Sequence, residues 1–214
     1  MKRLIIAIVS LSALCFASCG GGAGAGTNSA VSEAEKAVPV VSDPLFGELP
    51  SLQEQYKAAK KALKKEFEAK LKAIDDSNMD KAMQKANELK TEMKAAEETL
   101  KAHYDPKIKT AGEKLAGVKI PCTVDPAKYS SAEAVISGID GENKLQIKIT
   151  VTLASPLGGT PYIMWDYRDA AGQKIDQGAE YLKKGDYNAG SVVEINAPVN
   201  ASEMVGVASI YVGE

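Results

Sequence analysis

Few residues in this chain could perform catalysis. It contains a single histidine, His103, and three cysteines, Cys15, Cys19 and Cys122. A nucleophile needs a neighbouring base to activate it, and no local motif pairs a serine or Cys122 with His103. His103 follows a lysine-rich stretch, which favours a capping or solvated role near the end of a helix. Cys122 lies in an apparent strand, where a buried structural thiol is expected. We therefore predict no catalytic residue.

The sequence does not indicate a metal site either. Asp76, Asn78 and Asp80 have the spacing that opens a calcium-binding loop. Lys81 stands where that loop requires glycine, however, and Asn87 stands where it requires glutamate. Zinc sites need clustered cysteine or histidine residues, which the chain lacks. The acidic run fits a turn between two helices, and we predict neither a metal ion nor a cofactor.

Aromatic side chains in the C-terminal half could bind a ligand. Trp165 could stack on a sugar ring if its indole faced outward. Ile163, Trp165 and Tyr167 fall on one face of an alternating segment, which favours a core position for the indole. Both interpretations stay open, and the candidate ligand surface consists of Trp165, Tyr162, Tyr181 and Tyr187. Carboxylates distant in the sequence could also converge in a hydrolase site.

The N-terminus is typical of an export signal. Lys2 and Arg3 precede an apolar stretch, residues 4–14, that is too short to span a bilayer. The run Phe16-Ala17-Ser18-Cys19 resembles the bacterial lipobox, with Phe16 where that family most often has leucine. The resemblance implies a diacylglyceryl group on the Cys19 thiol, cleavage before Cys19 and acylation of the freed amine by a palmitate-type chain. Two acyl chains suffice to hold a protein stably at a membrane.

The lipoprotein resemblance also bears on location, disulfides and charge. In lipoproteins of the Bacteroidota type, acidic residues directly after the lipidated cysteine resemble a surface-export signal, and here the first acidic residue is Glu33. This favours an outer-membrane anchor that faces the periplasm. Processing leaves Cys122 as the one thiol without lipid, so no intramolecular disulfide is possible, although its reactivity stays open. Loss of Lys2 and Arg3 leaves 24 basic against 28 acidic residues, which disfavours a nucleic-acid partner.

Residues 19–50 have the composition of a tether. Cys19 is followed by a run of glycine and alanine, and Pro39, Pro44 and Pro50 occur without a sustained apolar period. We expect a flexible linker with a root-mean-square reach of roughly 30 Å. Apolar residues near its end could instead dock on the folded body: Val38, Val40, Val41, Leu45 and Phe46.

Residues 51–117 are dominated by lysine, glutamate and alanine, as in a long helix. Apolar residues recur at steps of three or four from Leu52 to Ile74 and again from Met79 to Leu100. Ser77 and Asp80 resemble a capping box between the two runs. We predict an antiparallel helical hairpin, coiled-coil-like in its seam. Pro106 predicts an end or kink of the second helix, followed by a short third helix.

The two halves of the mature chain have opposite charge. Residues 51–117 hold fifteen lysines, no arginine and twelve acidic residues, whereas residues 118–214 hold eight basic and twelve acidic residues. An ordinary solvated helix exterior explains the lysines. The alternative is a lysine-rich arm that meets anionic lipid, lipopolysaccharide or an acidic partner.

From Val118 onward the sequence is β-like. Residues 145–153 alternate strictly, with apolar residues at every odd position, which predicts a strand with one buried face. Asp140-Gly141 and Ala171-Gly172 indicate hairpin turns. We expect strands at 118–124, 132–139, 145–153, 161–168, 173–178, 191–197 and 205–212. Seven short strands in this length predict an antiparallel β-sandwich.

One stretch of the β-like half resembles a known module. Trp165-Asp166-Tyr167-Arg168-Asp169 and the following Ala170-Ala171-Gly172 are similar to the aromatic strand and turn of FxLYD-type immunoglobulin-like modules of bacterial envelope proteins. Lys184-Gly185-Asp186 resembles their later polar turn, while Tyr167 and Arg168 depart from the motif. The resemblance spans residues 130–212 and implies an immunoglobulin-like sandwich. It implies nothing specific about a ligand.

The sequence thus predicts an α+β protein in four parts: a signal peptide at 1–18, a lipidated tether at 19–50, a helical hairpin at 51–117 and an immunoglobulin-like β-sandwich at 118–214. We expect a non-enzymatic envelope lipoprotein that binds a protein partner, or itself, through the hairpin. Binding of a glycan or small ligand by the sandwich is the alternative, and a carboxylate-dependent hydrolase is a third reading.

Overall fold

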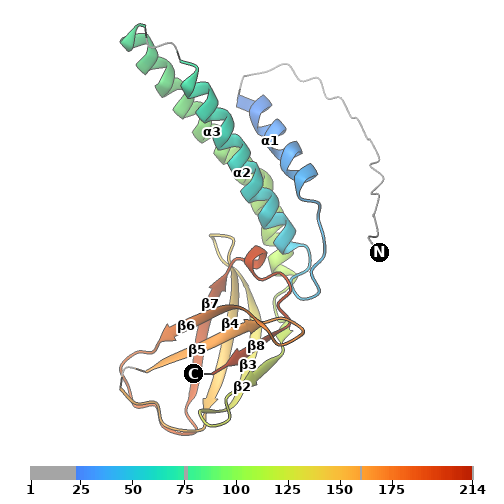
Figure 1. Ribbon diagram of the computed structural model, residues 1–214, viewed down its shortest axis with the longest axis vertical. Helices are drawn as coiled ribbons and strands as arrows, with labels where there is room; N and C mark the ends of the chain where they lie inside the picture. The colour runs from blue at the N-terminus through green and yellow to red at the C-terminus, as the bar shows by residue number, and fades with distance from the viewer. Residues whose placement is uncertain (1–22, 75–76, 160, 214) are drawn as a thin grey trace.

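The computed structural model describes residues 23–74, 77–159 and 161–213. Cys19 and the lipobox-like run lie outside these ranges. Three helices come first and two four-stranded sheets follow, largely antiparallel and arranged as a sandwich. The helices stand on one end of the sandwich and project away from it (Figure 1). The predicted α+β architecture, a helical hairpin followed by a β-sandwich, is confirmed.

The hairpin consists of α2, Leu49–Lys72, and α3, Met79–Glu113, which pack against each other. The N-cap of α3 is Asn78, one residue after the predicted Ser77. Its backbone is extended, with φ −130°, and its side-chain oxygen accepts a hydrogen bond from the backbone N–H of Lys81 at 3.1 Å. Asparagine caps a helix as well as serine does, so α3 begins after Asn78, where the backbone has the extended conformation of an N-cap.

The helix α3 continues through Pro106, and the predicted short third helix does not form as a separate element. A proline inside a helix removes one backbone hydrogen bond and crowds the preceding turn. Tyr104 and Ile108, on either side of Pro106, are both fully buried. Their packing holds both turns of the helix on the core, so tertiary contacts outweigh the local preference of proline.

A further helix, α1, spans Ala23–Ala37 inside the segment that the sequence predicts to be a flexible tether. It packs against both α2 and α3. Its contact face is made of small residues, Thr27, Ala30 and Ala34, which are nearly fully buried. A stripe of small residues produces almost no apolar periodicity in the sequence. The prediction of a flexible linker was therefore wrong over this segment, because composition does not reveal the close packing of small side chains. Phe46 and Leu49, after α1, are also fully buried.

The first sheet has the strand order β1-β3-β4-β7, and the second has the order β2-β8-β5-β6. The strands of the first sheet are β1 (Lys119–Ile120), β3 (Tyr129–Ile139), β4 (Leu145–Leu153) and β7 (Val192–Val199). Those of the second are β2 (Cys122–Val124), β5 (Tyr162–Arg168), β6 (Lys174–Tyr181) and β8 (Ser209–Val212). All pairs are antiparallel except β2 with β8, which is parallel. A short 3-10 turn, η1 (Ala201–Glu203), precedes β8.

The strand pattern of β4 is borne out residue by residue. Every odd position from Leu145 to Leu153 is buried, and every even position is half-exposed. The two predicted hairpin turns also form, between β3 and β4 and between β5 and β6. In each, an aspartate caps the turn: Asp140 accepts from the N–H groups of Glu142 and Lys144, and Asp169 accepts from those of Ala171 and Gln173. Side-chain caps of this kind make turns independent of distant contacts.

Candidate functional site

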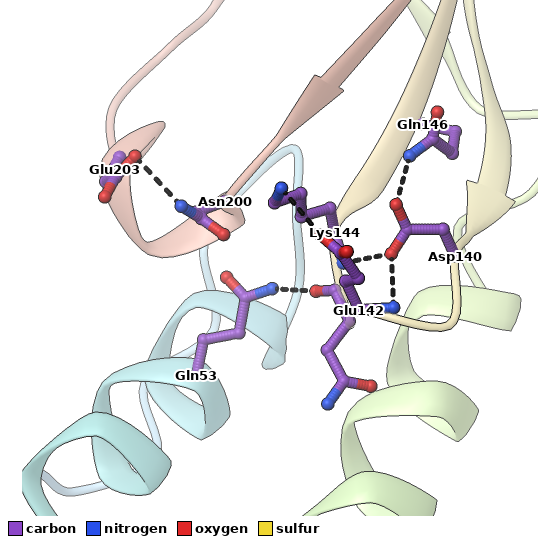
Figure 2. A network of polar contacts seen from close by, with 8 residues as sticks. Gln53, Asp140, Glu142, Lys144, Gln146, Asn200 and Glu203 are labelled. Carbon is purple, nitrogen blue, oxygen red and sulfur yellow. Dashed lines mark hydrogen bonds and ion pairs between the residues drawn. The ribbon is translucent and has the colours of Figure 1, made fainter.

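The base of the hairpin is joined to the sandwich by polar contacts. Gln53 of α2 donates from Nε2 to the backbone carbonyl of Asn143, at 2.7 Å, and accepts at Oε1 from the N–H of Ser202, at 2.9 Å. Asn143 in turn donates to Asp105 of α3, at 2.8 Å. In Figure 2, Gln53 lies between two segments of the sandwich. One is the β3–β4 turn, which carries Glu142 and Lys144, and the other carries Asn200 and Glu203. Both helices are therefore tied to the sandwich.

Close packing adds to this junction at the end of α3. A Cβ on Gly112 would lie 2.8 Å from Cδ1 of Ile139, so only glycine allows α3 to approach β3 this closely. Asn143 has a positive φ of 63°, a conformation that asparagine tolerates better than most residues. These contacts fix the direction in which the hairpin leaves the sandwich.

Among the described residues, no third helix packs against the far end of the hairpin. We call residues 71–74 and 77–93 the distal arm; it extends beyond α1 (Figure 1). Nearer the sandwich, the seam residues Leu63, Phe67 and Leu100 are almost fully buried. In the distal arm, Leu71 and Leu89 are only half-buried. Packing of two helices alone leaves part of the apolar seam in contact with water.

Two methionines extend the apolar surface of the distal arm. Met79 is 82% exposed, and Met83 is 64% exposed. From the sequence we expected Met79 to begin the apolar seam between the two helices. In the structure Met79 is exposed instead, because no described residue of α2 covers that end of α3. Methionine is flexible and polarisable, which suits it to contact surfaces of varied shape. Met79 and Met83 are the large apolar side chains that are exposed on the described helices.

Charged residues of the hairpin pair mostly within their own helix. Lys70 and Glu66 lie 2.7 Å apart, and Lys64 and Glu68 lie 4.0 Å apart, each pair one helical turn apart in sequence. Exposed pairs of this kind contribute only about 0.3–0.5 kcal/mol each. This supports the interpretation of the lysines as a solvated helix exterior.

The structure separates the four predicted ligand-surface residues. Tyr162 and Tyr181 meet on the outer face of the second sheet, with ring centroids 5.8 Å apart, and both are exposed. Tyr187 lies in the loop after β6, half-buried, and its hydroxyl donates to the carbonyl of Lys183 at 3.0 Å. Two of the four therefore form one surface, and Tyr187 does not join them.

Trp165 faces the interior of the sandwich and is 5% exposed, so the interpretation of an outward-facing sugar platform is wrong. The core interpretation holds, since Ile163 and Tyr167 are buried on the same face. The indole lies across β6 at Gly178, where a Cβ would be 2.3 Å from the ring. Burial raises the pKa of Tyr167 to about 12; the adjacent Trp165 indole N–H opposes the rise, and Asp176 adds to it. The indole N–H and the Tyr167 hydroxyl do not meet hydrogen-bond geometry.

Sequence reasoning missed a polar group on the same outer face. The guanidinium of Arg168 lies 4.0 Å from the ring centroid of Tyr211 and bonds to Asp166 at 3.0 Å. Lys174 contacts Asp166 at 2.8 Å. Burial pushes the pKa of Asp166 upward, but the bonds from Lys174 and Arg168 outweigh it and hold the pKa below its usual value. The alternation of β8 could have identified Tyr211, because Ile210 and Val212 on either side are core residues.

His103 and Cys122 lie in different parts of the fold, His103 in α3 and Cys122 in β2. His103 lies in the continuous part of α3, with Nε2 3.4 Å from Glu35 of α1 and 2.8 Å from Lys107 Nζ. Cys122 is half-buried in β2, and burial raises the pKa of its thiol to about 11, which disfavours the reactive thiolate. Within residues 23–74, 77–159 and 161–213, no three His, Cys, Asp or Glu side chains are grouped to hold a metal ion.

Helices in the described ranges are all too short or too polar to cross a bilayer. The predicted lipidation site, Cys19, lies outside the described residues, so membrane attachment through it stays a prediction.

Comparisons with known proteins add little. No protein-family model and no curated protein matches the chain. Among solved structures, one described as "Crystal structure of Campylobacter jejuni cj0090" is similar over 43% of this chain and 95% of that chain, with 10% sequence identity and a TM-score of 0.24. A TM-score this low carries no argument. The resemblances to lipoproteins and to FxLYD-type modules therefore also stay predictions.

Proposed function

We propose that this protein is a non-enzymatic envelope lipoprotein, anchored in the outer membrane through Cys19, that binds a protein partner with the distal arm of its hairpin. The observation that carries the proposal is the half-exposed seam of the distal arm, extended by Met79 and Met83. Burial of apolar surface stabilises association by roughly 25 cal/mol per Å² before the costs of association are subtracted. An exposed seam on a projecting helix pair is a surface of this kind.

The helix α1 indicates what the partner would contribute. Near the sandwich, α1 packs against both hairpin helices and completes a three-helix arrangement. Within the part of the chain that the structure describes, the distal arm offers the same two helices without a third. An amphipathic helix is therefore the occupant that fits, supplied by another envelope protein or by the distal arm of a second copy.

The rigid junction supports this use of the hairpin. Gln53 and Asn143 connect both helices to the sandwich, and the hairpin leaves the sandwich in a fixed direction. A fixed arm loses little conformational entropy on binding, which favours affinity.

The test is a crosslinked capture from the envelope with the full-length, membrane-attached protein. Met79→Ser/Met83→Ser removes the two exposed methionines without touching buried residues. Val192→Ser/Val205→Ser is the matched control, because these valines are similarly exposed on the sandwich, at 63% and 56%. We expect wild type and control to capture the same partner, and the methionine variant to lose it.

Analytical sedimentation of the detergent-purified chain tests whether the protein associates with itself. Dimers of wild type that become monomers in the methionine variant would identify a second copy as the partner. The proposal would be overturned by two results together: the wild type is a monomer, and it captures the same proteins as the methionine variant.

A second candidate function rests on the outer face of the second sheet. Tyr162 and Tyr181 form an exposed aromatic pair there, and Asp166 and Arg168 supply a fixed charge pair on the same strand. Exposed tyrosines beside fixed polar groups suit a glycan or a small aromatic ligand. Glycan-array binding by the full chain, lost in Tyr181→Ala and retained in Tyr187→Ala, would favour this function. Equal array profiles for wild type and Tyr181→Ala would exclude it.

A further inference from the structure

The two sheets of the sandwich are joined along one side and open along the other. On the joined side the chain passes from β1 in the first sheet to β2 in the second at Pro121, whose carbonyl accepts from the N–H of Ile210 at 2.9 Å. On the other side the outermost strands are β6 and β7, and each pairs with a single neighbour. Alternate residues of such a strand direct their N–H and C=O groups away from the sheet. Among the described residues, β6 and β7 therefore pair with no further strand on the open side.

A cleft of about 470 Å³ lies between these edges, and we call it the β6–β7 cleft. Residues 176–180 of β6 and 196–199 of β7 line its sides, while Trp165 and Tyr167 of β5 line it from within. Both aromatic residues are at least nine-tenths buried. The Trp165 indole N–H and the Tyr167 hydroxyl have no hydrogen-bond partner among the residues that the structure describes.

Unpartnered buried polar groups are costly, at about 1–3 kcal/mol each. The indole N–H can only donate, and the hydroxyl can donate or accept. A ligand that brought an acceptor to Trp165 would recover part of this cost. The β6–β7 cleft is thus lined by two adjacent polar groups, the indole N–H and the Tyr167 hydroxyl, that make no hydrogen bond of good geometry among the described residues.

The interior side of β6 is acidic where a core strand would be apolar. Residues paired directly across antiparallel strands share a face. Tyr167 pairs with Asp176, Trp165 with Gly178, and Ile163 with Glu180. Because the three β5 residues face the interior, Asp176 and Glu180 lie on that same side of β6, one on each side of Gly178. Asp176 is exposed there and Glu180 is half-buried.

The negative charge of the cleft is not balanced by the described residues around it. Glu203 adds a third carboxylate to the lining. Lys144 is the one lysine among the lining residues, and its Nζ is already paired with Glu142 at 2.9 Å. None of the ion pairs among the described residues involves Glu180. Asp176 accepts from the Gln177 N–H at 2.8 Å, and Glu203 accepts from the Asn200 side chain at 3.2 Å, but neither contact brings a positive charge. The cleft is therefore complementary to a cation.

We propose that the β6–β7 cleft binds an extended peptide segment that carries a lysine or arginine side chain. The backbone of the segment pairs with a free strand edge, as in β-strand addition, and closes the open side of the sandwich. One of its carbonyl groups accepts from the Trp165 indole N–H. Its basic side chain reaches Asp176 and Glu180.

A peptide fits these features better than a free organic cation does. A small ammonium ion would satisfy the carboxylates, but it brings no acceptor for the Trp165 N–H and leaves both strand edges unpaired. An extended chain supplies donors and acceptors at regular spacing together with the basic group. This surface is separate from the distal arm, so the proposal does not depend on the function proposed above.

Trp165 is the only tryptophan of the chain, so its fluorescence reports on the cleft directly. The probe is a nine-residue peptide of alternating lysine and threonine, titrated into the full-length chain in detergent. Three further probes separate the contributions: the same peptide with glutamate for lysine, the same peptide with alternate backbone amides N-methylated, and spermidine as a free cation. We expect a saturable change in Trp165 emission with the lysine–threonine peptide alone.

Two double variants test the carboxylates. Asp176→Asn/Glu180→Gln removes the charges on the interior side of β6, and we expect the dissociation constant of the peptide to rise about tenfold. Glu133→Gln/Glu194→Gln removes two carboxylates from the outer face of the first sheet, paired there with Lys119 and Lys148, and should leave the constant unchanged. Met79→Ser/Met83→Ser should also bind normally, which keeps this test distinct from that of the hairpin.

Three results would overturn the proposal. The first is no binding of the lysine–threonine peptide by fluorescence or calorimetry. The second is equal binding of the N-methylated peptide or spermidine, which would show charge attraction without strand pairing. The third is an equal effect of the two double variants, which would place the peptide elsewhere on the acidic surface.

Discussion

Gln53 and Asn143, ninety residues apart in sequence, are joined by a hydrogen bond of 2.7 Å from the Gln53 side-chain amide to the Asn143 carbonyl. The same Gln53 side chain accepts from the N–H of Ser202, so one residue of α2 holds two loops of the sandwich. Gln53 thus supplies two of the polar contacts that hold the hairpin on the sandwich.

Gln53→Ala should therefore destabilise the junction. It leaves the Asn143 carbonyl and the Ser202 N–H without their partner, and we expect a loss of about 1–3 kcal/mol in the free energy of unfolding. Urea denaturation measures the loss, and hydrogen exchange at residues 140–144 should increase. Gln84→Ala, which removes only an exposed contact to Glu88, is the control and should change stability by less than about 0.5 kcal/mol. Equal stabilities of the two variants would contradict the assigned role.

Gly178→Ala should disturb the packing of Trp165. The added Cβ would lie 2.3 Å from the indole, so the ring or β6 must move, at a cost of about 1–3 kcal/mol. The unfolding midpoint should fall, and the Trp165 emission should shift because the indole environment changes. Gly141→Ala is the matched control, since a Cβ there meets nothing within 4 Å. An unchanged emission spectrum of Gly178→Ala would show that the indole does not lie across this glycine.

Pro106→Ala should stabilise the protein. The substitution restores a backbone N–H inside α3 and removes the crowding of the preceding turn, which favours the helix by about 1–3 kcal/mol. Greater chain entropy of the unfolded state offsets this by up to about 1 kcal/mol. Thermal unfolding gives the measurement, with Pro126→Ala, in the loop before β3, as the comparison. A lower unfolding temperature for Pro106→Ala would mean that proline is required at this position.

Asp166→Asn should destabilise the sandwich in a pH-dependent way. The folded protein holds the pKa of Asp166 below its ordinary value of 3.8, because Lys174 and Arg168 bond to the carboxylate. A depressed carboxyl pKa adds stability above the unfolded pKa, and this stability is lost as the pH falls through the folded pKa. Wild type should thus be more stable than Asp166→Asn at pH 7, and the difference should shrink below pH 3.8. Urea denaturation at a series of pH values measures this, and a difference that stays constant down to pH 2 would refute the ionic explanation.

Several features were readable from the sequence because they depend on local chemistry. The strict alternation of Leu145–Leu153 predicted β4, since a strand with one buried face needs that period. Asp140 and Asp169 mark their turns because each side chain caps backbone N–H groups only a few residues away. The acidic interruption before α3 located the start of that helix to within one residue. The alternation of Trp165 with Ile163 and Tyr167 favoured an inward-facing indole, and the structure has the indole buried.

Other features depend on contacts that no local pattern encodes. The helix α1 forms because Ala30 and Ala34 pack against two helices that come later in the chain. Pro106 stays inside α3 because Tyr104 and Ile108 are buried on either side. Each is a case in which burial against distant residues outweighs a local preference.

The sequence by itself determined the helical hairpin and the β-rich half that follows it, because hydrophobic period and turn chemistry act over a few residues. It also contained the lipobox-like signal that predicts the anchor. The tertiary structure decided which surfaces stay open: the distal arm that α1 does not reach, and the β6–β7 cleft with Asp176 and Glu180 beside Trp165. Exposure of an apolar seam or a strand edge depends on which other elements cover it. That is set by the packing of the whole chain, which no single stretch of sequence specifies.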